Sequence, residues 1–162
     1  MNYIFGYGSL ITPWGINGRN MKRVYLAKDL TPALLFGCRR EWNTVYNGQK
    51  YLGLILGLEP LLHYANGVIF PISDSDLLPF SDSEGIGNKF NPPMYTLENV
   101  TEFITTSLTI NPEDKIFTCV TVNPTSKGII PPHYMPLIED GFKLWGPKFK
   151  QIFLETTYEH ID

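Results

Sequence analysis

The sequence has no run of basic residues and only a small excess of negative charge. It carries 13 lysines and arginines against 16 aspartates and glutamates, which gives a formal net charge of −3. This balance excludes nucleic acid and anionic membrane surfaces as expected partners, because both attract clustered positive charge. No segment approaches the roughly 20 apolar residues of a membrane span, and the N-terminus has neither region of a signal peptide. We therefore expect a cytoplasmic protein.

Cysteine and histidine are also scarce. The two cysteines, Cys38 and Cys119, allow one disulfide at most, and without a secretion signal we expect free thiols. The three histidines, at positions 63, 133 and 160, are scattered without the spacing of metal ligands. We expect no metal site and no cofactor.

Turn formers and aromatic residues are plentiful. A chain of 162 residues fits one domain (residues 1–162), and an apolar fraction of 43% is ample for a packed core. The 14 glycines and 13 prolines favour short strands joined by turns over long helices. We therefore predict an α+β fold, a small mixed β-barrel with a few helices packed outside it.

Local patterns give expected boundaries for the elements. We predict strands at 2–6, 33–43, 52–58, 68–72 (after an Asn66-Gly67 turn), 97–104 and 115–122. We predict helices at 76–80, with a cap within 73–75 and a limit at Pro79, at 132–141, ending on Gly141, and from Gly146-Pro147 onward. Residues 13–31 and 85–95 read as irregular loops, with Arg19, Lys22 and Arg23 in solvent.

The most informative segment follows the first expected strand and reads Phe5-Gly6-Tyr7-Gly8-Ser9-Leu10. Glycine accepts a positive φ and lets a ligand approach the main chain, and the N–H groups of such a loop can form an anion-binding concavity. Ile11 stands where a dinucleotide fingerprint or a nucleophile elbow needs glycine, and no P-loop lysine follows. A plain structural turn remains the alternative.

The Tyr7-Gly8-Ser9-Leu10 motif resembles the opening of the γ-glutamylcyclotransferase-like superfamily. A second stretch, residues 66–72 followed by 77–85, is similar to that family's other signature and puts Glu84 on the family's acid–base glutamate. Ser81 stands on the usual aspartate, and Asn88 replaces a usual tyrosine. Residues 131–138 resemble a late Pro-Pro-x-Tyr segment, which makes Tyr134 a pocket residue.

The resemblance implies a γ-glutamylcyclotransferase-like fold and a small-molecule γ-glutamyl substrate that is cyclised to 5-oxoproline. It implies Glu84 as the catalytic residue and Tyr7, Gly8, Ser9, Leu10 and Tyr134 as substrate-binding residues. Two alternatives stay open: an inactive relative that binds a small carboxylate, and a protein-interaction module. The arginines Arg39 and Arg40 fit either a substrate carboxylate or a surface ion pair. The leaving group and the oligomeric state are not predicted.

Overall fold

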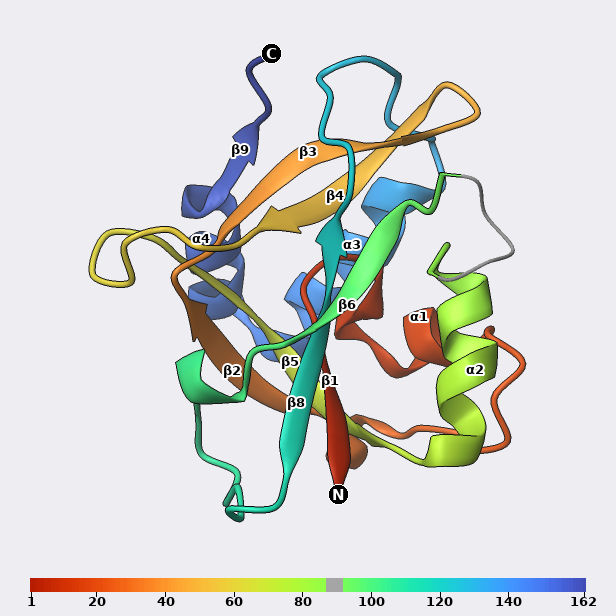
Figure 1. Cartoon of the computed structure of the whole chain (residues 1–162), viewed down its shortest axis with the longest axis vertical. Helices are drawn as coiled ribbons and strands as arrows, with labels where there is room; N and C mark the ends of the chain where they lie inside the picture. Colours follow the sequence, from red (N-terminus) through yellow and green to blue (C-terminus); the bar gives the residue numbers. More distant parts are fainter. Residues whose placement is uncertain (87–91) are drawn as a thin grey trace.

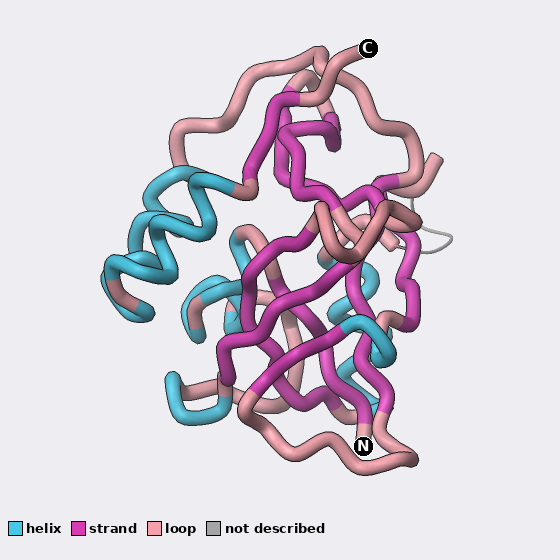
Figure 2. The backbone as a smooth tube through the Cα atoms, turned by 90° about the vertical axis from the view of Figure 1, so that its left-hand side faces the viewer, coloured by secondary structure: helices cyan, strands magenta, loops and turns pink. Residues whose placement is uncertain are grey.

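The computed structural model describes residues 1–86 and 92–162, and its centre is a mixed sheet of nine strands. Figure 2 shows these strands as a strongly curved sheet with the helices around it. The strands are β1 (Asn2–Gly6), β2 (Thr31–Phe36), β3 (Arg39–Tyr46), β4 (Gln49–Ile55), β5 (Tyr64–Ile72), β6 (Tyr95–Asn99), β7 (Ile104–Thr106), β8 (Lys115–Thr121) and β9 (Thr157–Glu159).

The sheet is open, so the expected α+β class is confirmed but closure into a barrel is wrong. The strand order is β7-β2-β5-β1-β8-β4-β3-β9, with β6 paired to β8. Among the described residues, β7 pairs only with β2 and β9 only with β3. These two end strands have three residues each and do not pair with one another in the strand order, so the sheet stays open. The first strand, β1, lies inside the sheet, antiparallel to β5 and parallel to β8.

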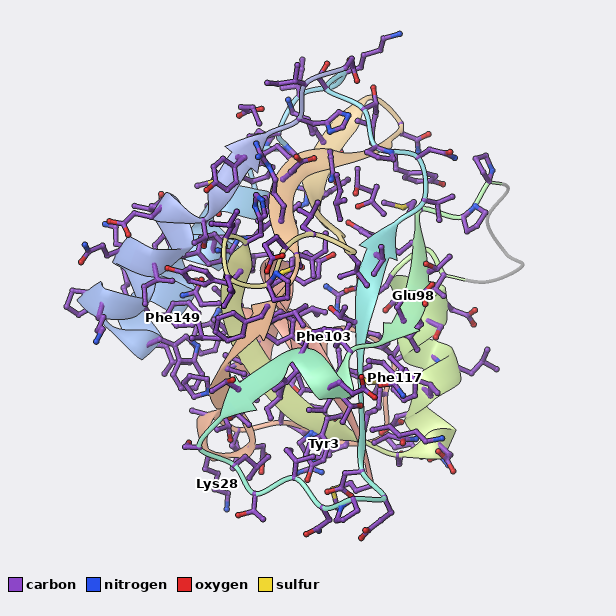
Figure 3. The ribbon with its side chains drawn as sticks, turned by 60° about the vertical axis from the view of Figure 1, so that its left-hand side comes forward. Tyr3, Lys28, Glu98, Phe103, Phe117 and Phe149 are labelled. Carbon is purple, nitrogen blue, oxygen red and sulfur yellow. The ribbon has the colours of Figure 1, made fainter. Side chains whose placement is uncertain are left out.

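Four α-helices surround the sheet: α1 (Pro13–Asn17), α2 (Asp74–Ser83), α3 (Tyr134–Trp145) and α4 (Pro147–Glu155). Short 3-10 turns lie at η1 (Ser9–Ile11), η2 (Ala27–Asp29) and η3 (Thr101–Phe103). Helices α2 and α4 lie at opposite sides of the molecule (Figure 1). In Figure 3, Phe149 on α4 and Glu98 on β6 lie at opposite sides of the view.

The expected cap of α2 is confirmed, because the Ser73 hydroxyl accepts a hydrogen bond from the Asp76 amide. Pro79 does not end this helix, which continues to Ser83 with Phe80 fully buried against the core. The loop expected at 13–31 contains α1, which Thr12 caps through the Gly15 amide.

The turn predicted at Asn66-Gly67 was wrong. Asn66-Gly67 lies inside β5, where the Asn66 side chain donates to the Phe149 carbonyl and so ties the strand to α4. The tight turn lies instead between β3 and β4 at Asn47-Gly48, where both residues have a positive φ. The strand expected at 97–104 is interrupted by η3.

The helix expected to end at Gly141 runs on to Trp145. Gly141 packs against Ile11, because a Cβ there would lie 2.3 Å from the Ile11 Cδ1. The helix stops at Gly146, whose φ of +100° is the left-handed conformation that glycine tolerates. Of the loop expected at 85–95, residues 87–91, which include Asn88, lie outside the described residues.

The buried apolar side chains form one cluster, drawn from both halves of the chain. Its fully buried members include Ile4, Phe5, Leu35, Leu54, Phe70 and Phe80. Burial of each large apolar side chain stabilises the fold by about 1.5–3 kcal/mol. This core holds rigid the ends of β1, α2 and α3, from which the candidate site is built.

Both cysteines are free thiols, as expected, and both are buried. Burial raises the pKa of Cys38 to about 12 and raises the pKa of Cys119 as well. Because only the thiolate is a strong nucleophile, this raised pKa lowers the reactive fraction of Cys38 near neutral pH well below that of a free cysteine. We expect no alkylation of the native protein by iodoacetamide and two adducts after unfolding, read by intact mass. One adduct formed at the rate of a free thiol in the native protein would contradict this burial.

Candidate functional site

A cavity of about 480 Å³ opens where the first loop, the end of α2 and the start of α3 meet. Every residue that the sequence analysis selected for the site lines it: Tyr7, Gly8, Ser9, Leu10, Glu84 and Tyr134. The rest of the wall is mainly apolar and aromatic, with Tyr51 and Leu52 from β4, Tyr95 from β6 and Leu137 from α3. The cavity size fits a small metabolite.

The first loop leaves β1 at Gly6 and enters the short turn η1. Gly8 has a φ of −137°, so a positive φ is not what requires glycine there. The requirement is space, because a Cβ on Gly8 would lie 2.7 Å from the Tyr134 hydroxyl oxygen. The main chain at Gly8 therefore lies close to the Tyr134 side chain of α3 and lines the cavity.

Glu84 follows the last residue of α2 and caps that helix. Its amide donates to the Phe80 and Ser81 carbonyls, which fixes the backbone from which the carboxylate enters the cavity. The side chain is 15% exposed. Burial raises the pKa of the Glu84 carboxyl above its ordinary value, and the neighbouring Arg19 opposes part of that rise. A carboxyl with a raised pKa is suited to accepting and returning a proton near neutral pH.

Three of the tyrosines that line the cavity lie near Glu84. The Tyr7 hydroxyl donates to the Cys119 carbonyl at 2.6 Å, and the Tyr95 hydroxyl donates to the Leu52 carbonyl at 2.8 Å. The Tyr134 ring packs edge-on against Trp42 and Tyr51. Burial raises the pKa of all three phenols, so they are neutral hydrogen-bonding groups at physiological pH.

Arg19 also lines the cavity, although the sequence analysis expected it in solvent. Its Nη1 donates to the Glu84 Oε2 at 2.6 Å, and its Nη2 donates to the Ser9 hydroxyl at 3.3 Å. Its Nε donates to the Gly15 carbonyl, so α1 directs the side chain inward. Lys22 and Arg23 are exposed, as expected. The missed signal was Thr12-Pro13, a capping residue followed by proline at the first helical position, which predicts α1.

Arg40 is fully buried and is therefore neither a surface ion pair nor part of the cavity wall. Its guanidinium donates to the carbonyls of Tyr7, Asn66 and Phe153, to the Asn66 side chain and to two threonine hydroxyls. Its hydrogen bond to the Tyr7 carbonyl fixes the position of the first loop. Arg39, by contrast, forms an ion pair with Glu41 at 3.0 Å.

Within residues 1–86 and 92–162, no group of three or more His, Cys, Asp or Glu side chains can hold a metal ion. No helix in this part of the chain is long and apolar enough to cross a membrane.

Solved structures with the same architecture share this arrangement of strands and helices. A structure described as a γ-glutamyl cyclotransferase superposes on 95% of this chain with a TM-score of 0.68, at 15% identity and over 86% of its own length. This chain has a γ-glutamyl cyclotransferase-like fold. An uncharacterized protein from Homo sapiens has the same fold, with a TM-score of 0.64 over 99% of this chain and 90% of its own, at 15% identity.

The γ-glutamyl cyclotransferase-like fold also occurs in YkqA from Bacillus subtilis. That structure matches 96% of this chain with a TM-score of 0.63 and 18% identity, and this chain spans 55% of its length. No family model matches the sequence. No curated protein matches it either. The γ-glutamyl cyclotransferase-like fold is thus recognised through its structure at identities of 15–18%.

Proposed function

We propose that this chain is a γ-glutamyl cyclotransferase, which converts a γ-glutamyl amide to 5-oxoproline and a free amine or amino acid. The observation that carries the proposal is that a buried carboxylate, Glu84, and the Tyr7–Leu10 loop face one cavity of metabolite size. The shared fold supports it further.

The reaction needs no nucleophile from the protein. The α-amine of the γ-glutamyl residue attacks its own γ-carbonyl carbon, a carbon–nitrogen bond forms, and the bond to the leaving amine breaks. The pocket holds amine and carbonyl together, which converts conformational freedom into rate. Glu84 takes the proton that the attacking amine loses and returns it to the leaving nitrogen, so its carboxylate is unchanged at the end.

The first loop has two tasks in this proposal. Its main-chain N–H groups bind the α-carboxylate of the substrate. The same groups stabilise the oxyanion that develops on the γ-carbonyl, an effect worth roughly 3–4 kcal/mol per donor in other enzymes. Tyr134 contacts Gly8 from α3 and so closes the cavity over the bound head group.

One observation favours the alternative of an inactive carboxylate-binding relative. Arg19 occupies Glu84 in a 2.6 Å ion pair, and a carboxylate that remains so paired is a poor base. Incubation with γ-glutamyl amino acids, glutathione and γ-glutamyl-ε-lysine, with 5-oxoproline detected by mass, separates the two. Formation of 5-oxoproline supports the enzyme, and ligand binding without it supports the inactive relative.

Gly8→Val is expected to weaken binding of a γ-glutamyl ligand by about 10- to 100-fold, because overpacking of this kind costs about 1–3 kcal/mol. The new side chain must displace either the Tyr134 hydroxyl or the loop itself. Calorimetric titration measures the loss. Gly18→Val is the matched control, because a Cβ on Gly18 meets nothing within 4 Å. If Gly8→Val bound the ligand normally, the loop would have only the structural role of a turn.

A further inference from the structure

The Arg19–Glu84 pair is the one ion pair found between residues that line the cavity, within the described part of the chain. Its two side chains come from segments 65 residues apart, and they are 17% and 15% exposed. The pair therefore lies at the cavity surface, where a ligand can reach both charges. The cavity thus presents one positive and one negative group side by side.

Arg19 is held so that its terminal nitrogens face the cavity. The Gly15 carbonyl accepts a hydrogen bond from Nε at 3.1 Å, which anchors the inner end of the guanidinium to α1. The outer nitrogens reach the Glu84 Oε2 and the Ser9 hydroxyl. A guanidinium in this position can bind a carboxylate through two parallel hydrogen bonds, and here its second contact is a weak one at 3.3 Å.

The head of a γ-glutamyl compound carries the complementary charges. Its α-carbon bears an ammonium and a carboxylate, separated by about the distance that separates the two partners of an ion pair. We infer that the substrate exchanges with the ion pair: Arg19 joins the main-chain N–H groups of the first loop in binding the α-carboxylate, and Glu84 receives the α-ammonium. This inference rests on the proposed function, and it defines the substrate class as amides with an unblocked γ-glutamyl head.

The exchange also explains how the Glu84 carboxylate, which is paired with Arg19 in the free protein, becomes a base. While Arg19 contacts Glu84, it holds the pKa of that carboxyl down against the effect of burial. Once the guanidinium binds the substrate carboxylate instead, Arg19 lowers the pKa of Glu84 less, and burial then raises that pKa further. Glu84 thus gains affinity for a proton when the ammonium that must lose one arrives.

The test uses glutamine, the smallest γ-glutamyl amide, and two analogues that each lack one charge. The compound 4-aminobutanamide lacks the α-carboxylate, and glutaramic acid lacks the α-amine. Dissociation constants for all three are measured by calorimetry on the wild type, Arg19→Gln and Arg23→Gln. Arg23 is the matched control, because it is exposed and pairs with Asp29, away from the cavity.

For the wild type and Arg23→Gln, we expect loss of the α-carboxylate to weaken binding by about 10- to 100-fold, the effect of a charge-assisted contact. For Arg19→Gln, we expect the same loss to weaken binding at least about threefold less than in the wild type, because only the main-chain N–H groups of the first loop then contact the α-carboxylate. Loss of the α-amine should weaken binding to Arg19→Gln as well, because Glu84 remains. A general disruption of the fold would reduce binding of all three ligands and lower the melting temperature, and that pattern would overturn the assignment.

An unchanged preference for glutamine over 4-aminobutanamide in Arg19→Gln would also overturn it, as would no binding of glutamine by the wild type at millimolar concentration. The proposed function fails separately. If the preference depends on Arg19 but no amide in the substrate panel yields 5-oxoproline, the exchange stands and the protein is a binding relative.

Discussion

Glu84→Gln should lower turnover of a γ-glutamyl amide by about 10²–10⁴-fold, the usual size of a lost general acid–base contribution. The amide of glutamine keeps the size of the side chain but cannot accept and return a proton at neutral pH. Its oxygen can still accept the hydrogen bond that Arg19 Nη1 now donates to the Glu84 Oε2. We therefore expect the fold and the cavity to persist, with kcat as the parameter that falls.

The measurement is steady-state release of 5-oxoproline, together with the melting temperature of each variant. Glu139→Gln, an exposed acid on α3, is the control and should match the wild type. A folded Glu84→Gln protein that retains full turnover would show that another group carries the proton. If Glu84→Gln lost its melting transition as well as its activity, unfolding would explain the loss. The prediction therefore includes an unchanged melting temperature for this variant.

Arg40→Met should lower the free energy of unfolding by about 3–5 kcal/mol, because it leaves several buried acceptors unpaired. The wild-type guanidinium is fully buried and also stacks on the Phe153 ring, 3.6 Å from its centroid. Methionine fills much of the same volume but donates nothing, so the carbonyls of Tyr7 and Asn66 lose their contacts with Arg40. Each buried acceptor left unpaired costs about 1–3 kcal/mol.

Urea unfolding of Arg40→Met and Arg39→Met makes the comparison direct. The side chain of Arg39 is 30% exposed, and it interacts with Glu41 and the Tyr158 ring. Glu41 is buried but keeps its contacts with Asn43 and His160 when Arg39 is lost, and a cation–π contact contributes about 1 kcal/mol, so Arg39→Met should be the milder change. Equal losses in the two variants, or a loss below about 1 kcal/mol in Arg40→Met, would refute the structural role assigned to Arg40.

The parts of the fold that the sequence predicts are those that depend on local pattern. The alternating run at 115–122 is β8, Ser73 caps α2, and Pro147 begins α4. Turn signals were less decisive, because an Asn-Gly pair fits both a hairpin turn and a strand interior. At Asn47-Gly48 the pair makes the turn, whereas Asn66 uses its side chain to join β5, Arg40 and α4.

Short motifs that resemble a known family pointed to six site residues in the sequence, and all six line one cavity. Their roles remain predictions. The surroundings of Arg19 and Arg40 were predicted wrongly for the same physical reason. A charged residue is expected to lie in solvent unless its partner, distant in the sequence, is known. The partner of Arg19 lies 65 residues away, and the acceptors of Arg40 lie on β5, α4 and the segment after α4.

The place of β1 inside the sheet has a consequence for how the chain folds. Its two neighbours, β5 and β8, begin about 60 and 110 residues later along the chain. When the chain emerges from a ribosome, β1 has no partner strand until β5 has been made, and its second hydrogen-bonding edge stays open to other chains until β8 follows. Non-local pairing of this kind closes large loops and slows folding, so we expect aggregation during synthesis to be the main hazard. Mutations that weaken the pairing of β8 should therefore reduce the yield of soluble protein out of proportion to the free energy of unfolding that they remove.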